Sequence, residues 1–267
     1  MSPSSFHGVT TTVFGNCGVG FAPARSDSHD WLIQLMEGVE DIPGAALSEG
    51  IDWNWETFPE YLDALEEMPR VMDIATQVPH GSVRAYVMGE RGARNEEPTP
   101  DDLVEMAKIV QEGIEAGALG FTSSRTMLHR ALDGEPVPGT FAGADELIAM
   151  GKAVAEAGGG VVEVASDIGL GGLEGNFGSD IDWMRELASE YGLTVTYALN
   201  QSDNHPQQWR DLLELSSAPV EGDGKVIAQV AGRPAGLLFG LETSLLSLIH
   251  ISEPTRPRLR SYAVFGV

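Results

Sequence analysis

The first predicted strand of the chain ends in a glycine-rich loop, and both lie in the stretch His7-Gly-Val-Thr-Thr-Thr-Val-Phe-Gly-Asn-Cys-Gly-Val-Gly-Phe-Ala-Pro23. The β-branched run from Val9 to Val13 predicts the strand, and the glycines after it predict the loop. Cys17, the only cysteine of the protein, lies in that loop. On the residues alone two interpretations stay open. Cys17 is either an ionisable ligand at a strand end, where α/β barrels build their sites, or a small buried hydrophobic side chain.

Outward from this stretch, short apolar strands alternate with amphipathic helices. Further strands are predicted over 71–78, 118–124, 161–166, 193–199 and 225–231, and helices over 27–39, 101–116, 143–157, 180–191 and 206–215. We expect residues 82–88 to be extended as well. Strands that are apolar throughout are typical of parallel sheets buried on both faces. A (β/α)₈ barrel and a doubly wound open sheet share this pattern, and the periodicity does not choose between them.

Composition narrows the possible partners and the compartment. The formal net charge of −24 argues against nucleic acid and disfavours anionic membranes, because both carry negative charge. No apolar run approaches the ~20 residues that span a bilayer, and the N-terminus does not resemble a secretory signal. A single cysteine cannot form an internal disulfide, which fits a reducing cytoplasm. We therefore expect a cytoplasmic protein that binds neither nucleic acid nor membrane, of undetermined oligomeric state.

Four motifs point to one family. GVTTTVFGNCGVGFAP (8–23), VPHGSVRAYVMG (78–89), EAGALGFTSSR (115–125) and NQSDNHPQQW (200–209) resemble the N-acyl-D-amino-acid deacylases, or D-aminoacylases, of the amidohydrolase superfamily. The resemblance covers roughly residues 3–245. It selects the barrel over the open sheet and implies a partial (β/α)₈ TIM-like barrel of the metal-dependent hydrolase type, with about six of the eight strands present.

The two ends of the chain depart from the family pattern. The His-x-His motif that the resemblance places on the first barrel strand is absent, so we expect residues 1–245 to be an incomplete amidohydrolase barrel. Residues 246–267 place three arginines within five positions of an otherwise acidic chain, and resemble translated sequencing-adaptor DNA of metagenomic assemblies. We interpret them as a non-native tail, the alternative being a genuine basic tail. The chain is thus expected to be an internal fragment, inactive alone.

The resemblance implies a divalent metal, zinc in the first instance, and suggests two ligands. Cys17 matches the cysteine ligand of the family's GNCG motif. Glu163 is a carboxylate inside an apolar strand, which a metal or an ion pair with Arg84 or Arg125 would compensate. The family carries histidine ligands on strands five and six, whereas those strand ends here contain Glu163 and Asn200.

Four residues are candidates for binding substrate: His80, Arg84, Ser123 and Asn200. For two of them a purely structural role is the alternative. His80 could instead hold its loop in place, and Arg84 could form a structural ion pair in an acid-rich protein. Trp53 and Trp55, in the acidic segment 40–57, either shape a pocket or pack that segment onto the body.

The resemblance thus implies a metal-dependent amidohydrolase that cleaves a C–N amide bond in a small-molecule N-acyl amino acid or a related amide. Two alternatives remain open. One is another hydrolase or a lyase on the same barrel, because a fold does not determine function. The other is a truncated barrel without catalytic activity.

Overall fold

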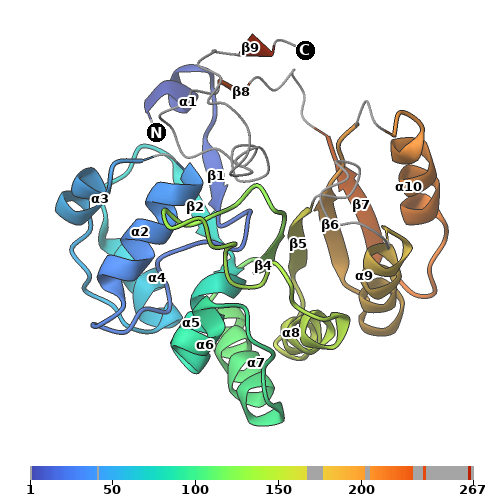
Figure 1. Ribbon diagram of the computed structural model, residues 1–267, viewed down its shortest axis with the longest axis horizontal. Helices are drawn as coiled ribbons and strands as arrows, with labels where there is room; N and C mark the ends of the chain where they lie inside the picture. The colour runs from blue at the N-terminus through green and yellow to red at the C-terminus, as the bar shows by residue number, and fades with distance from the viewer. Residues whose placement is uncertain are drawn as a thin grey trace, which may run out of the picture.

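Parallel strands flanked by helices form most of the structure (Figure 1), a computed structural model. It describes residues 2–40, 42–166, 177–201 and 205–230, together with 237–238 and 264–265. The strands are β1 (Thr11–Phe14), β2 (Asp73–Thr76), β3 (Val78–Pro79), β4 (Gly120–Arg125), β5 (Val161–Ser166), β6 (Thr194–Ala198), β7 (Lys225–Gln229), β8 (Leu237–Leu238) and β9 (Val264–Phe265).

The helices lie mainly between successive strands. They are α1 (Ser2–Phe6), α2 (His29–Glu40), α3 (Gly44–Gly50), α4 (Phe58–Glu67), α5 (His80–Met88), α6 (Glu90–Ala93), α7 (Pro100–Glu115), α8 (Ala144–Glu156), α9 (Phe177–Tyr191) and α10 (Gln208–Ser217). The predicted alternation of helices and strands is confirmed.

The strands follow one another in chain order. β1 pairs with β2 in parallel, and β3 to β7 form a parallel sheet in the order β3-β4-β5-β6-β7. Only Gln77 separates β2 from β3, so these two short strands act as one interrupted strand that connects the two sheets. Parallel neighbours joined by helices are the βαβ units of α/β proteins.

Local sequence signals explain the helix that covers β3 and β4. The Thr99 side chain accepts a hydrogen bond from the Asp102 N–H, and the Asp102 carboxylate accepts one from the Thr99 N–H, while Pro100 occupies the first turn. Helix α7 then buries one face, which includes Met106 and Val110, against the sheet.

The main core lies between the outer face of the sheet and helices α7 to α9 (Figure 1). Phe121, Val162 and Val195 supply fully buried side chains from three neighbouring strands, and Leu147 and Met184 meet them from the helices. These strand residues stand in register, so their side chains point to the same face.

Two local predictions had different outcomes. The extended conformation predicted for 82–88 is wrong, because these residues belong to helix α5, which begins directly after Pro79. The packing interpretation of Trp55 is confirmed: its side chain is buried, and its indole N–H donates to the Phe21 carbonyl at 2.8 Å.

The boundary at 245 and the tail 246–267, except for Val264 and Phe265, lie outside the described residues. No helix in the described part of the chain is both long and apolar enough to cross a bilayer.

The close contact between β4 and β5 yields a stability prediction. A Cβ atom on Gly120 would lie 1.9 Å from the Val161 carbonyl oxygen, so Gly120→Ala must displace the strand backbone. We expect it to lower the free energy of unfolding by about 3 kcal/mol in chemical denaturation. Gly50→Ala is the control, since nothing lies within 4 Å of its Cβ position. Similar losses for both variants would contradict the predicted contact.

Candidate active site

The loop after β1 lies against the end of β4. The Gly18 N–H donates to the Thr122 hydroxyl at 3.2 Å, and the Gly18 carbonyl accepts from the Gly81 N–H at 2.9 Å. Gly18 has a φ of 75°, and a Cβ there would lie 2.5 Å from the Ser124 nitrogen. Only glycine meets both constraints, so this residue determines how closely Cys17 approaches the sheet.

Cys17 occupies an acidic, half-buried environment. Its Sγ lies 4.0 Å from Oε1 of Glu40 at the end of α2. Burial raises the pKa of the Cys17 thiol, and the negative charges of Glu40 and Glu163 raise it further. The thiol is therefore protonated near neutrality unless a cation lies beside it.

Glu163 is held by two carboxamides. Its Oε2 accepts a hydrogen bond from Gln77 Nε2 at 2.5 Å, and its Oε1 accepts one from Gln229 Nε2 at 3.2 Å. Both glutamines lie two strands away from β5, on opposite sides. They reach Glu163 across the intervening strands, so this face of the sheet is concave.

Threonines complete the same face. Thr122 and Thr196 stand in register with Glu163, so the three side chains share one side of the sheet. Gln229 Nε2 also donates to the Thr196 hydroxyl at 3.0 Å. We call Gln77, Thr122, Glu163, Thr196 and Gln229 the inner polar layer. The Cys17 loop is bonded to this layer through Thr122.

The inner polar layer and the Cys17 loop carry side chains of the kinds that bind metals. Cys17 and Glu163 supply a thiol and a carboxylate, and the buried Gln77 Oε1 has no hydrogen-bond partner among the described residues. Within the described ranges, however, no three His, Cys, Asp or Glu side chains come close enough together to hold a metal. A site centred on Cys17 and Glu163 alone is therefore incomplete.

Three of the predicted substrate-binding residues form a network on the opposite face. His80 Nδ1 lies 2.8 Å from Ser123 Oγ, and His80 Nε2 lies 2.9 Å from Glu146 Oε1. Arg84 donates to the same Glu146 oxygen and, at 2.5 Å, to the Glu96 carbonyl. The exposed fractions of His80, Arg84, Ser123 and Glu146 are 0%, 2%, 0% and 3%. The ion-pair alternative for Arg84 is thus confirmed.

The charges in this network shift two pKa values. Burial lowers the pKa of His80, and the charges of Arg84 and Arg125 lower it further, against the opposing effect of Glu146. Burial by itself would raise the pKa of Glu146, but the hydrogen bonds and charges of His80 and Arg84 outweigh burial and lower it.

The ion pair with an arginine, one of the two alternatives left open for Glu163, is not formed among the described residues. Arg84 pairs with Glu146, and Arg125 pairs with Asp180 at 3.1 Å, while Glu163 is bonded to glutamines. Asn200 lies just beyond β6 and is half-buried. No hydrogen bond among the described residues connects it to the network.

Sequence reasoning did not identify Glu146, Gln77 or Gln229. Glu146 lies in the first turn of α8, where an acid is common at the surface of a protein. Both glutamines lie at strand ends, and this position is the sequence signal that could have identified them.

Comparison with known proteins agrees with this arrangement. A family model described as "Amidohydrolase family" matches residues 1–243. A D-aminoacylase of Alcaligenes xylosoxydans xylosoxydans is 34% identical over 125 residues, which are 46% of this chain and 22% of that protein. An uncharacterized protein of Mycobacterium tuberculosis is 32% identical over 145 residues, 51% of this chain and 23% of that protein.

Solved structures show the same fold. A D-aminoacylase crystal structure gives a TM-score of 0.61 at 22% identity, covering 88% of this chain and 44% of that chain. The N-acyl-D-glutamate deacylase of Bordetella bronchiseptica, complexed with zinc and a phosphonate inhibitor, gives 0.57 at 20% identity with the same coverage. The chain spans less than half the length of these proteins. The predicted α/β fold of the partial TIM-barrel type is confirmed.

The buried ion pair yields a stability prediction. Glu146→Ala leaves the Arg84 guanidinium buried without its partner, so we expect the free energy of unfolding to fall by about 3–5 kcal/mol in urea denaturation. Glu156→Ala on the same helix is the control. Its carboxylate is 59% exposed and lies 3.6 Å from the Lys152 amine, so little change is expected. Comparable losses in both variants would show that the network adds no stability.

His80 yields a prediction on pH. Its pKa is lower in the folded protein than its ordinary value of 6.5, so the unfolded chain takes up a proton that the folded chain does not. Stability should therefore be full above pH 6.5 and decrease as the pH falls below it. The pKa of Glu146 is lower in the folded protein than its ordinary value of 4.5, so the unfolded chain also takes up this proton first and stability decreases further below pH 4.5.

Urea midpoints between pH 7.5 and pH 5 test this sign. His80→Gln should flatten the dependence, whereas His7→Gln, at an exposed position, should keep the wild-type slope. An unchanged slope in His80→Gln would rule out His80 as the responsible group.

Proposed function

Because this chain belongs to the amidohydrolase family, we propose that the whole protein hydrolyses the amide C–N bond of an N-acyl amino acid with the help of a divalent metal, zinc. The observation that carries the proposal is the concave inner face, on which the Cys17 loop is bonded to Thr122, the strand neighbour of Glu163. The names of the relatives support the substrate class, since they include a D-aminoacylase and an N-acyl-D-aspartate deacylase.

Cys17 and Glu163 are proposed as two of the metal ligands. A thiolate and a carboxylate both suit zinc, and a cation beside Cys17 would reverse the rise in its pKa. When bound, the metal would supply an activated water and polarise the substrate carbonyl. Gln77 and Gln229 hold the Glu163 carboxylate in place, and the unpartnered Gln77 Oε1 is available to a further donor or cation.

The four predicted substrate-binding residues take different roles in this proposal. Asn200 is half-buried at a strand end, so its amide can hydrogen-bond a substrate carbonyl or carboxylate. His80, Arg84 and Ser123 are sealed from solvent, and we assign them to positioning the ends of β3 and β4 from the outer side. The Cys17 thiol must stay reduced to bind metal, which favours the cytoplasm.

One observation favours a second candidate. The described residues supply fewer than three clustered His, Cys, Asp or Glu side chains, as a barrel that binds its ligand without catalysis would. Metal content and turnover together separate the two candidates.

The proposal predicts the zinc content of the whole protein and its variants. Cys17→Ala and Glu163→Gln should each retain less than half of the wild-type zinc after dialysis, measured by plasma mass spectrometry, because each removes a ligand. Glu156→Gln, which changes an exposed carboxylate, should retain all of it. Unchanged zinc in Cys17→Ala would remove Cys17 from the site.

Turnover is measured on the same samples with N-acetyl-D- and N-acetyl-L-amino acids. Cys17→Ala should lower kcat/KM by about 100-fold or more, since loss of a group that supports the metal already costs 10–100-fold. Absence of turnover in a zinc-loaded wild type would favour the binding candidate.

A further inference from the structure

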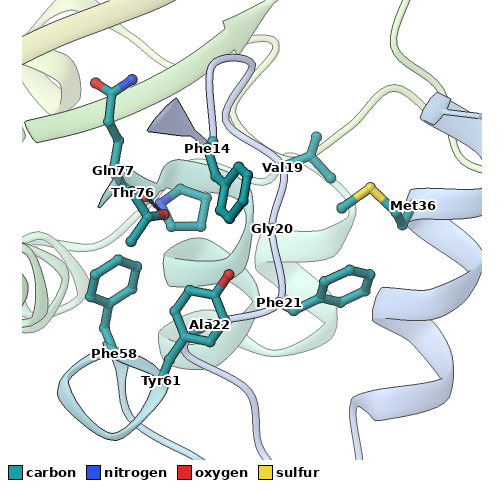
Figure 2. Close-up of a pocket in the computed structure, with 12 residues that line it drawn as sticks. Phe14, Val19, Gly20, Phe21, Ala22, Met36, Phe58, Tyr61, Thr76 and Gln77 are labelled. Carbon is teal, nitrogen blue, oxygen red and sulfur yellow. Dashed lines mark hydrogen bonds between the residues drawn. The ribbon is translucent and has the colours of Figure 1, made fainter. Parts of the chain in front are cut away.

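A pocket of about 200 Å³ lies on the other side of the Cys17 loop. Figure 2 shows the rings of Phe14, Phe58 and Tyr61 around it, with Phe21 and Met36 beyond them. Phe14 and Thr76 pair in register and both line the pocket. Gln77, the next residue, also lines the pocket, while its side-chain amide reaches Glu163 on the inner face. By the alternation of side chains along the strand, Phe14 and Thr76 therefore place the pocket against the outer face, with Gln77 between it and the inner polar layer.

Hydrogen bonds fix the backbone that forms its walls. The Phe14 carbonyl accepts from the Gln77 N–H at 3.2 Å, the Gly20 carbonyl from the Ser82 hydroxyl at 2.7 Å, and the Phe21 carbonyl from the Trp55 indole at 2.8 Å. These bonds come from three separate parts of the chain. The pocket is therefore preformed, which lowers the entropic cost of binding.

The lining combines aromatic and aliphatic side chains with three polar ones, Tyr61, Thr76 and Gln77, and carries no charged side chain. Its polar side chains include Tyr61, whose hydroxyl has no hydrogen-bond partner among the described residues. The Tyr61 ring is fixed between Trp55 and Phe58, with ring centroids 5.0 and 5.7 Å away. Burial raises the pKa of Tyr61, so the hydroxyl stays neutral and can donate or accept one hydrogen bond.

We propose that this pocket binds a small neutral aromatic molecule that carries one hydrogen-bonding group, with Tyr61 as its polar contact. The size agrees, since an apolar cavity of about 150 Å³ accommodates benzene. A phenol presents one apolar ring and one hydroxyl, which match the walls and the Tyr61 hydroxyl. Anionic ligands are excluded because the lining offers no cation to compensate them. This binding needs no metal, although Gln77 both lines the pocket and holds the Glu163 carboxylate.

Calorimetric titration with p-cresol and toluene tests the proposal on the metal-free protein. Tyr61→Phe removes the hydroxyl and keeps the ring, so p-cresol should bind about tenfold more weakly while toluene binding changes less than about twofold. Tyr86→Phe is the matched control, because that hydroxyl already donates to Glu56 and lies outside the pocket. It should bind both ligands as the wild type does.

A filling variant gives a second measurement. Ala22 is a buried lining residue, and Ala22→Leu should weaken p-cresol and toluene alike by more than about tenfold. The proposal is overturned if p-cresol fails to bind the wild type at about 10 mM. It is also overturned if Tyr61→Phe and Tyr86→Phe have equal effects on p-cresol.

Discussion

The contact of Gly18 with β4 is the constraint on which the rest of the site depends. The loop backbone comes so close to Ser124 that no side chain fits, and the φ of 75° independently favours glycine. The hydrogen bond to Thr122 connects this loop to the inner polar layer. Cys17 precedes Gly18 directly, so its position follows from that contact. Gly20, two residues later, lies against Pro79 and forms a wall of the outer pocket.

The two faces of the sheet carry different kinds of side chains. In β4, Thr122 faces the inner layer, whereas Phe121 and Ser123 face the helices. The outer face combines an apolar core with a buried ionic network, in which Glu146 compensates Arg84 and bonds His80. Such a network is costly to interrupt, because a lone charge would remain in the interior. It therefore maintains the strand ends from which the inner face is built.

Local sequence signals predicted the order of helices and strands, but they could not predict contacts between residues that are far apart in the sequence. The cap at Thr99 and Pro100 depends on neighbouring residues, so the start of α7 could be read directly. The structural role of Arg84 was foreseen as an alternative, but its partner Glu146 lies 62 residues away and no local pattern identifies it. Glu163 was recognised as a charge in an apolar strand, yet its partners are uncharged glutamines from distant strands. The extended conformation expected for residues 82–88 is not observed, because these residues form helix α5.

The central proposal is that Cys17 and Glu163 bind one metal ion at the inner face. X-ray absorption at the zinc edge of the zinc-loaded protein tests it most directly. Coordination by Cys17 should give one sulfur scatterer at about 2.3 Å, with the remaining scatterers nitrogen or oxygen at about 2.0–2.2 Å, and the sulfur should be lost in Cys17→Ala. A first shell made of nitrogen and oxygen alone in the wild-type protein would contradict it.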